Sequence, residues 1–282
     1  MSTTFSDSDL LPVGEISQQE NVVIGSAGNR DLIGTLYIPP RIQESRPAMV
    51  IVHGGGWRKG STRGVSGFGE FLSRAGFVCL CPSYRLSGEA HWPAQIEDVK
   101  CAIRYLKVNK KQFGLDKDRV GITGDSAGGH LALMAAVHSD FEGSGGHIAA
   151  SSNVKAVGAM YGPVRVRKTR ADGSPLGLLD PTATDTEYAS ASPIHYDLTE
   201  FPPCLLIHGA DDPAVPLSGT LEFYTKLVEL GRTVELHSFA GEGHAFDRRS
   251  STQERMVDIL DPSSISGPTV IRLLTRFFKK YL

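Results

Sequence analysis

The sequence predicts an α/β protein with a mostly parallel, eight-stranded sheet and helices on both faces. Three observations support this. Short, continuous apolar runs recur along the chain, which is typical of strands buried on both faces. Segments with apolar residues at helical spacing lie between these runs. The first two runs read as a hairpin that precedes the alternation. A chain that alternates strand and helix in this way favours a parallel sheet with crossover helices.

The predicted strands begin with the hairpin, in which residues 21–26 and 32–38 are joined by Gly28 and Asn29. Six later apolar runs are predicted as further strands: 48–52, 77–80, 120–123, 157–161, 204–208 and 234–239.

Helices are predicted between and after these strands. Ile96, Val99, Ile103 and Leu106 repeat at helical spacing after Pro93, a residue suited to the start of a helix. Residues 131–137 are helical and rich in small side chains, and segments 217–230 and 270–281 are amphipathic.

Residues 1–18 read as a polar tail, and residues 19–282 as a single domain. A core of that size needs no disulfide staples. Residues 164–200 contain few apolar periods and many turn formers. A long segment of this kind in a compact domain is usually functional, so we expect a substrate lid or cap here. The alternative is a plain surface excursion.

Composition excludes several classes of function. The formal net charge is −2, so no broad basic field is available for nucleic acid or an anionic membrane. No apolar run approaches the length of a membrane span, and the N-terminus lacks the features of a signal peptide, so we expect a cytoplasmic protein. The cysteines Cys79, Cys81, Cys101 and Cys204 lie in apolar segments, which predicts buried free thiols.

Ser126 is the predicted nucleophile. It lies in Gly124-Asp125-Ser126-Ala127-Gly128, which matches G-x-S-x-G, with a strand directly before it and a helix directly after. Glycines two residues to either side remove side chains that would collide at such a strained turn. A helix cap would account for the serine, but not for the flanking glycines.

The predicted oxyanion hole is formed by a glycine loop that directly follows the strand 48–52. In His53-Gly54-Gly55-Gly56-Trp57, backbone N–H groups can approach a substrate oxygen without interference from side chains. Gly55 and Gly56 are the expected donors, with Ala127 supplying the third. A phosphate-binding loop would require Lys and Ser or Thr at the start of a helix, which residues 58–61 imitate poorly.

A serine nucleophile needs a histidine base and a carboxylate to orient it. His244 lies in a glycine-rich loop after the last predicted strand, where a catalytic imidazole is expected. His208 ends a strand before Gly209 and more readily supports a turn. Asp211 and Asp212 both follow that strand as candidate acids, and composition does not choose between them. Glu242 is a third candidate, but it lies so close to His244 in the sequence that it would face Nδ1 awkwardly.

The motifs HGGGW, GDSAGGH, HGADDPAVP and GEGHAF, in this order, resemble those of α/β-hydrolase esterases over about residues 48–244. Trp57, His130 and the short N-terminus resemble the bacterial carbohydrate esterases, similar to acetylxylan and feruloyl esterases, and GDSAGG resembles the hormone-sensitive-lipase-like branch. The resemblance implies an α/β-hydrolase fold. The family pattern H-G-x-x-D-x-x-V-P implies that Asp212 is the acid.

This resemblance implies a serine hydrolase that cleaves short-chain or carbohydrate-linked carboxylic esters and requires no metal or organic cofactor. An arylformamidase with the same triad is one alternative, and a non-catalytic binding protein that kept the fold is another. Trp57, Tyr161 and Phe246 are candidates for lining a substrate pocket. The natural substrate and the oligomeric state are left open.

Overall fold

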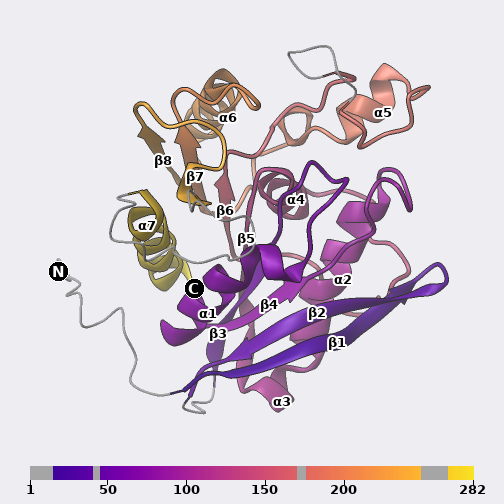
Figure 1. The fold of residues 1–282 in the computed structure, drawn as a ribbon, viewed down its shortest axis with the longest axis vertical. Helices are drawn as coiled ribbons and strands as arrows, with labels where there is room; N and C mark the ends of the chain where they lie inside the picture. Colours follow the sequence, from indigo (N-terminus) through magenta and orange to yellow (C-terminus); the bar gives the residue numbers. More distant parts are fainter. Residues whose placement is uncertain (1–14, 41–44, 170–175, 249–265) are drawn as a thin grey trace.

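The computed structural model describes residues 15–40, 45–169, 176–248 and 266–282. The described chain forms one eight-stranded sheet in the order β1-β2-β4-β3-β5-β6-β7-β8 (Figure 1). Its strands are β1 (Ser17–Ala27), β2 (Arg30–Ile38), β3 (Arg46–Val52), β4 (Val78–Pro82), β5 (Leu115–Asp125), β6 (Ala156–Met160), β7 (Cys204–Gly209) and β8 (Val234–Phe239). β2 is antiparallel to both of its neighbours, and from β4 to β8 all pairings are parallel. The predicted mostly parallel sheet is confirmed.

The N-terminal hairpin has the predicted two-residue turn. Ala27 pairs with Arg30, so Gly28 and Asn29 form the connection, and Gly28 has a φ of +60°. A tight hairpin turn needs such a left-handed conformation, which glycine adopts without steric cost.

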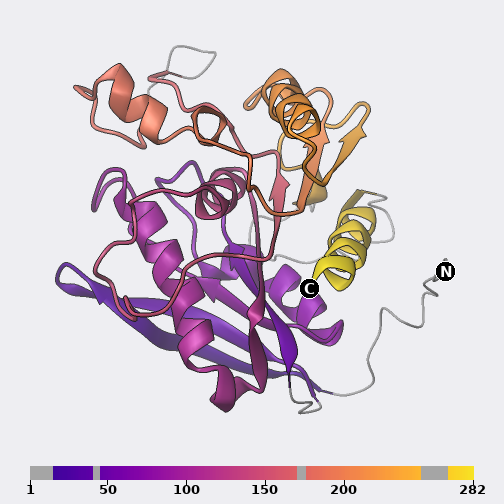
Figure 2. The same ribbon diagram turned by 180° about the vertical axis from the view of Figure 1, so that it is seen from behind.

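Helices cover both faces of the sheet (Figures 1 and 2). α1 (Ser66–Arg74) and α7 (Ser266–Tyr281) pack together on one face, where their apolar side chains join one buried cluster. α2 (Ala94–Val108), α4 (Ala127–Ala136) and α6 (Leu217–Glu229) contribute to the second cluster on the other face. The sheet is therefore buried on both sides, which explains the continuous apolar strands.

Three helices differ from the sequence prediction. α1, α3 (Lys110–Phe113) and α5 (Asp185–Ser190) were not expected. α1 contains two glycines that mask its apolar period of Phe68, Phe71 and Leu72. α4 begins at Ala127, directly after Ser126 as the G-x-S-x-G motif predicts, so the segment read as helical from residue 131 covers only its later part.

β1 begins at Ser17, just inside the segment predicted as a tail, of which residues 1–14 lie outside the described residues. The predicted lid segment 164–200 contains α5 and the short helix η3 (Pro193–His195), and residues 170–175 of it are outside the described residues. All four cysteines are free and buried, as predicted. In the part of the chain that the structure describes, none of the helices combines the length and apolar character that a bilayer crossing requires.

Candidate active site

Ser126 lies between the end of β5 and the start of α4, at the carboxyl edge of the sheet. Its backbone has φ +51° and ψ −117°, a conformation that L-residues rarely adopt. The turn pushes the side chain out of the sheet, and Ser126 is partly exposed although both of its neighbours are buried. A helix begins at the next residue, so its positive dipole end faces the region around the hydroxyl.

The glycines around Ser126 are required because backbone segments pass very close to them. A Cβ on Gly128 would lie 2.0 Å from the carbonyl oxygen of Val52, and one on Gly124 would lie 2.5 Å from that of Gly128. No such contact is sterically tolerable. The strand β3, the elbow and the first turn of α4 therefore pack at backbone-to-backbone distance.

Ser126, His244 and Asp212 come together from three distant segments. Ser126 Oγ is 2.9 Å from His244 Nε2, and His244 Nδ1 is 2.7 Å from Asp212 Oδ2. Asp212, not Asp211, meets the histidine, and the Asp211 side chain is exposed. The Asp212 carboxylate accepts a hydrogen bond from Nδ1, so Nδ1 carries the proton and Nε2 can accept the hydrogen of the serine hydroxyl.

Backbone hydrogen bonds hold the histidine loop against the acid loop. The N–H of Ala210 donates to Phe239 O at 2.8 Å, and the N–H of Asp211 donates to Glu242 O at 2.9 Å. Gly209 allows this approach, because a Cβ there would lie 2.4 Å from Glu242 O. The separation of acid and base is therefore set by main-chain contacts rather than by flexible side chains.

Asp212 is held as an anion. Burial by itself raises the pKa of this carboxyl, but hydrogen bonds from His208, His244 and the Val215 N–H outweigh burial and hold the pKa well below its usual range. Its Oδ1 accepts from the N–H groups of Ala214 and Val215 at 2.8 and 2.9 Å. A permanently charged acid stabilises the imidazolium that forms when Ser126 gives up its proton.

The glycine loop after β3 lies beside the elbow. The N–H of Gly54 donates to Asp125 Oδ1 at 3.0 Å, so this group is already occupied. Gly55 and Gly56 have φ values of +121° and +62°, which orient their peptides differently from those of a strand. Ala127 is the first residue of α4, and its N–H has no acceptor within the helix. The role of Gly55, Gly56 and Ala127 as oxyanion donors stays a prediction, and the bond to Asp125 makes Gly54 a less suitable donor.

Sequence reasoning did not find the role of Asp125 or of His130. Asp125 is 2% exposed and ties the glycine loop to the elbow. His130, one turn after Ser126, accepts from Trp57 Nε1 at 3.2 Å and donates from Nε2 to Ala191 O at 2.7 Å. Burial lowers the pKa of His130 to about 4, which keeps it neutral. The sequence offered one indication of these roles, because Asp125 directly precedes Ser126 and His130 directly follows Gly129 of the motif.

The three candidate pocket aromatics are almost fully buried in the described structure. Trp57 is 2% exposed, and Tyr161 and Phe246 are each 1% exposed. Trp57 donates to His130, and Tyr161 Oη donates to Asp247 at 2.6 Å. The Tyr161 ring packs edge-on against His244 and Phe246. Rings of this size fill the space between the loops and the sheet, and contact of these three residues with a substrate stays a prediction.

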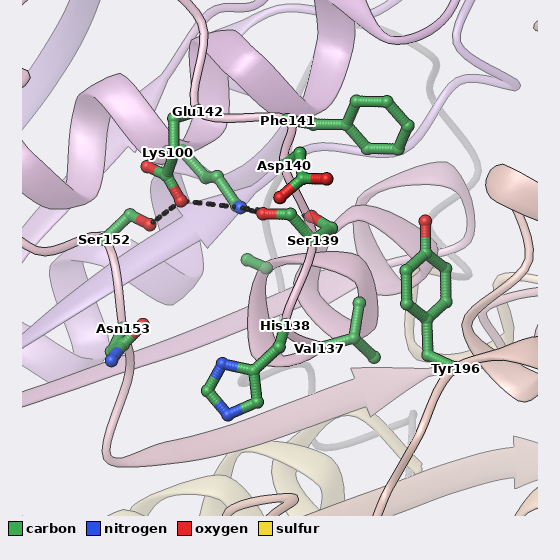
Figure 3. A pocket seen from close by; sticks show the side chains of 11 residues that line it. Lys100, Val137, His138, Ser139, Asp140, Phe141, Glu142, Ser152, Asn153 and Tyr196 are labelled. Atoms are coloured by element: carbon green, nitrogen blue, oxygen red, sulfur yellow. Dashed lines mark hydrogen bonds and ion pairs between the residues drawn. The ribbon is translucent and has the colours of Figure 1, made fainter.

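A cavity of about 470 Å³ lies elsewhere, beyond the end of α4 (Figure 3). None of Ser126, Asp212 and His244 lines it. Glu142 there pairs with the buried Lys100 at 2.9 Å and the buried Arg104 at 2.8 Å, and it accepts from Ser152. These contacts fasten the loop after α4 to α2.

Among the described residues, no three His, Cys, Asp or Glu side chains gather in a way that could hold a metal ion.

The model of the BD-FAE family matches residues 35–227, which is most of the chain. The chain belongs to the BD-FAE family. This BD-FAE chain is 30% identical over 257 residues to Esterase LipQ of Mycobacterium tuberculosis, with 86% of this chain and 60% of that protein covered. It is 29% identical over 255 residues to the probable carboxylic ester hydrolase LipM of the same organism, with 86% and 57% covered. The BD-FAE chain spans somewhat more than half the length of these curated relatives.

Solved structures show the same fold. A truncated form of a carbohydrate esterase from gut microbiota superposes with a TM-score of 0.75 and 26% identity, covering 94% of this chain and 96% of that one. Esterase 2 of Thermogutta terrifontis, phosphonylated by cyclosarin, has a TM-score of 0.77 and 24% identity, covering 96% and 95%. The predicted α/β-hydrolase fold of this BD-FAE protein is confirmed.

Proposed function

We propose that this protein is a serine hydrolase that cleaves carboxylic esters through an acyl-enzyme. One observation carries the proposal: Ser126 Oγ lies 2.9 Å from His244 Nε2, whose other nitrogen lies 2.7 Å from a buried, anionic Asp212. Such a constellation activates a hydroxyl for attack on an acyl carbon. The two esterase relatives covering 86% of the chain support the same reaction.

In the proposed mechanism, Ser126 Oγ attacks the ester carbonyl carbon while His244 Nε2 takes the hydroxyl proton. The N–H groups of Gly55, Gly56 and Ala127 stabilise the oxyanion. His244 then gives its proton to the departing alcohol oxygen, leaving the acyl group on the serine. Water attacks this ester, with its proton passing to His244 and back to Ser126 Oγ as the acid leaves. Asp212 stays ionised throughout.

We infer a substrate with a short or carbohydrate-linked acyl ester rather than a lipid. The similarity to a carbohydrate esterase supports this class. Propionate and butyrate were bound to the Thermogutta terrifontis esterase, and for this chain they guide the choice of assay. A series of p-nitrophenyl esters from acetate to octanoate, run beside acetylated xylan and methyl ferulate, tests the class. Highest kcat/KM on long acyl chains would refute it.

The nucleophile is tested with Ser126→Ala, which should lower hydrolysis of p-nitrophenyl acetate by on the order of 10⁴-fold or more. Ser218→Ala, at an exposed position of α6, is the matched control and should behave as wild type. A fluorophosphonate probe should label wild type and the control, but not Ser126→Ala. Full activity of Ser126→Ala, or unchanged labelling, would overturn the proposal.

Amide hydrolysis is the second candidate function. Arylacetamide deacetylase of Oryctolagus cuniculus is 35% identical over 128 residues, covering 43% of this chain and 32% of that protein. The same triad cleaves an amide when His244 protonates the leaving nitrogen. Parallel assays on phenyl acetate and N-formylkynurenine separate the two, and a higher kcat/KM on the formamide would favour the amidase.

A further inference from the structure

We infer that His208 is a positioning residue for the reaction, and that it holds the carboxylate of Asp212 in place at the oxygen that also contacts His244. This inference rests on the proposed function. His208 is the penultimate residue of β7 and precedes the acid by four positions. Its side chain is 1% exposed and that of Asp212 is fully buried, so the contact between them is shielded from water.

The Nε2 atom of His208 faces two oxygen atoms of the acid loop. It is 2.9 Å from the carbonyl oxygen of Val215 and 3.4 Å from Oδ2 of Asp212. Both oxygens are acceptors only, so Nε2 carries the proton. This single N–H therefore anchors the turn after β7 and points toward the same carboxylate oxygen that receives His244 Nδ1.

Thr220 fixes the tautomer of His208. Its Oγ1, on α6, is 2.8 Å from His208 Nδ1. Because Nε2 donates, Nδ1 of the imidazole can accept, and the threonine hydroxyl donates to it. With Nδ1 satisfied in this way, the proton remains on Nε2, where it faces Asp212. The arrangement runs from Thr220 through His208 and Asp212 to His244 and Ser126.

The consequence for catalysis is electrostatic as well as geometric. The titratable side chains that bond to Asp212 are His208 from β7 and His244 from the loop after β8, while Asp211 beside it points to solvent. A further titratable group in this region, Glu242, lies in the same loop as His244. Without the hydrogen-bond donor of His208, the negative charge of the Asp212 carboxylate is less neutralised and attracts the His244 imidazolium more strongly. The imidazolium therefore persists to higher pH. The neutral base then becomes available only at higher pH.

Three variants test this. His208→Leu removes the donor, and we expect kcat to fall about 10- to 100-fold with KM within about twofold of wild type. In the plot of kcat/KM against pH, the midpoint of the rise on the acid side (the acid limb) should shift to higher pH by about half a unit or more. His208→Gln retains an N–H near the position of Nε2 and should restore most of the activity and the wild-type limb. Thr220→Val should move the limb in the same direction, by less.

His237→Leu, on the neighbouring strand β8, is the matched control and should keep the wild-type limb, because its partner is Glu235. Labelling of Ser126 by fluorophosphonate and the thermal unfolding midpoint are measured for every variant. An unmoved limb in folded His208→Leu, or equal loss in His208→Gln, would overturn the role of His208. If His208→Leu does not fold, an unmoved limb in Thr220→Val overturns it. Failure of wild type to label refutes the proposed function itself.

Discussion

Replacing Gly209 with alanine should disable the histidine while leaving the backbone of β7 intact. The added Cβ would lie 2.4 Å from Glu242 O and 2.6 Å from Gly243 O, both main-chain atoms that no rotamer change can move. Real Cβ contacts are essentially never below 3.0 Å, so the loop must retreat by at least about 0.6 Å. A shift of this size carried to His244 stretches the 2.9 Å contact with Ser126 to about 3.5 Å, the outer limit of a hydrogen bond.

We therefore expect kcat for p-nitrophenyl acetate to fall about 10- to 100-fold in Gly209→Ala, with little change in KM. Gly88→Ala is the matched control, because no atom lies within 4 Å of its Cβ, and it should retain wild-type kinetics. Thermal unfolding separates local misplacement from loss of the fold. A folded Gly209→Ala variant with kcat within about threefold of wild type would refute the reasoning that this close approach positions His244.

Three further predictions follow from the buried charges and histidines. Asp212→Asn should lower kcat about 10⁴-fold, because an amide does not hold His244 in the required tautomer, whereas Asp211→Asn should stay within about threefold in the same ester assay. The unfolded pKa of His130 is about 6.5 and its folded pKa is about 4, so the unfolded state binds more protons between these values. The free energy of unfolding should therefore fall by up to about 3 kcal/mol from pH 7 to pH 4, measured by urea denaturation, and His130→Gln should lack this part of the slope. Glu142→Gln should lower the free energy of unfolding by about 2 kcal/mol with kcat unchanged, because two buried cations lose their counter-charge.

Each of these has a contrary result. Greater damage from Asp211→Asn than from Asp212→Asn would show that the other aspartate orients the base. A His130→Gln variant with the wild-type pH slope would assign the acid sensitivity to other groups. Unfolding of Glu142→Gln at the wild-type urea midpoint would show that solvent already screens the exposed part of this carboxylate.

The strands and the elbow were predictable from sequence because their determinants are local. β8 has the predicted bounds, and β7 is one residue longer than predicted. Glycines at 124 and 128 mark a backbone approach that any G-x-S-x-G turn requires. α1 and α5 were not found, because glycines mask the period of the first and the second has no fully buried residue.

By itself, the sequence determined the order of the strands, the nucleophile turn and the glycine loop, since each depends on residues adjacent in the chain. Only the tertiary structure showed that Asp212, the acid that the family pattern implies, contacts His244, and that Trp57, Tyr161 and Phe246 are almost fully buried. It also brought His208 and Thr220 beside the acid. These contacts join segments far apart in sequence, and packing rather than local pattern sets their distances.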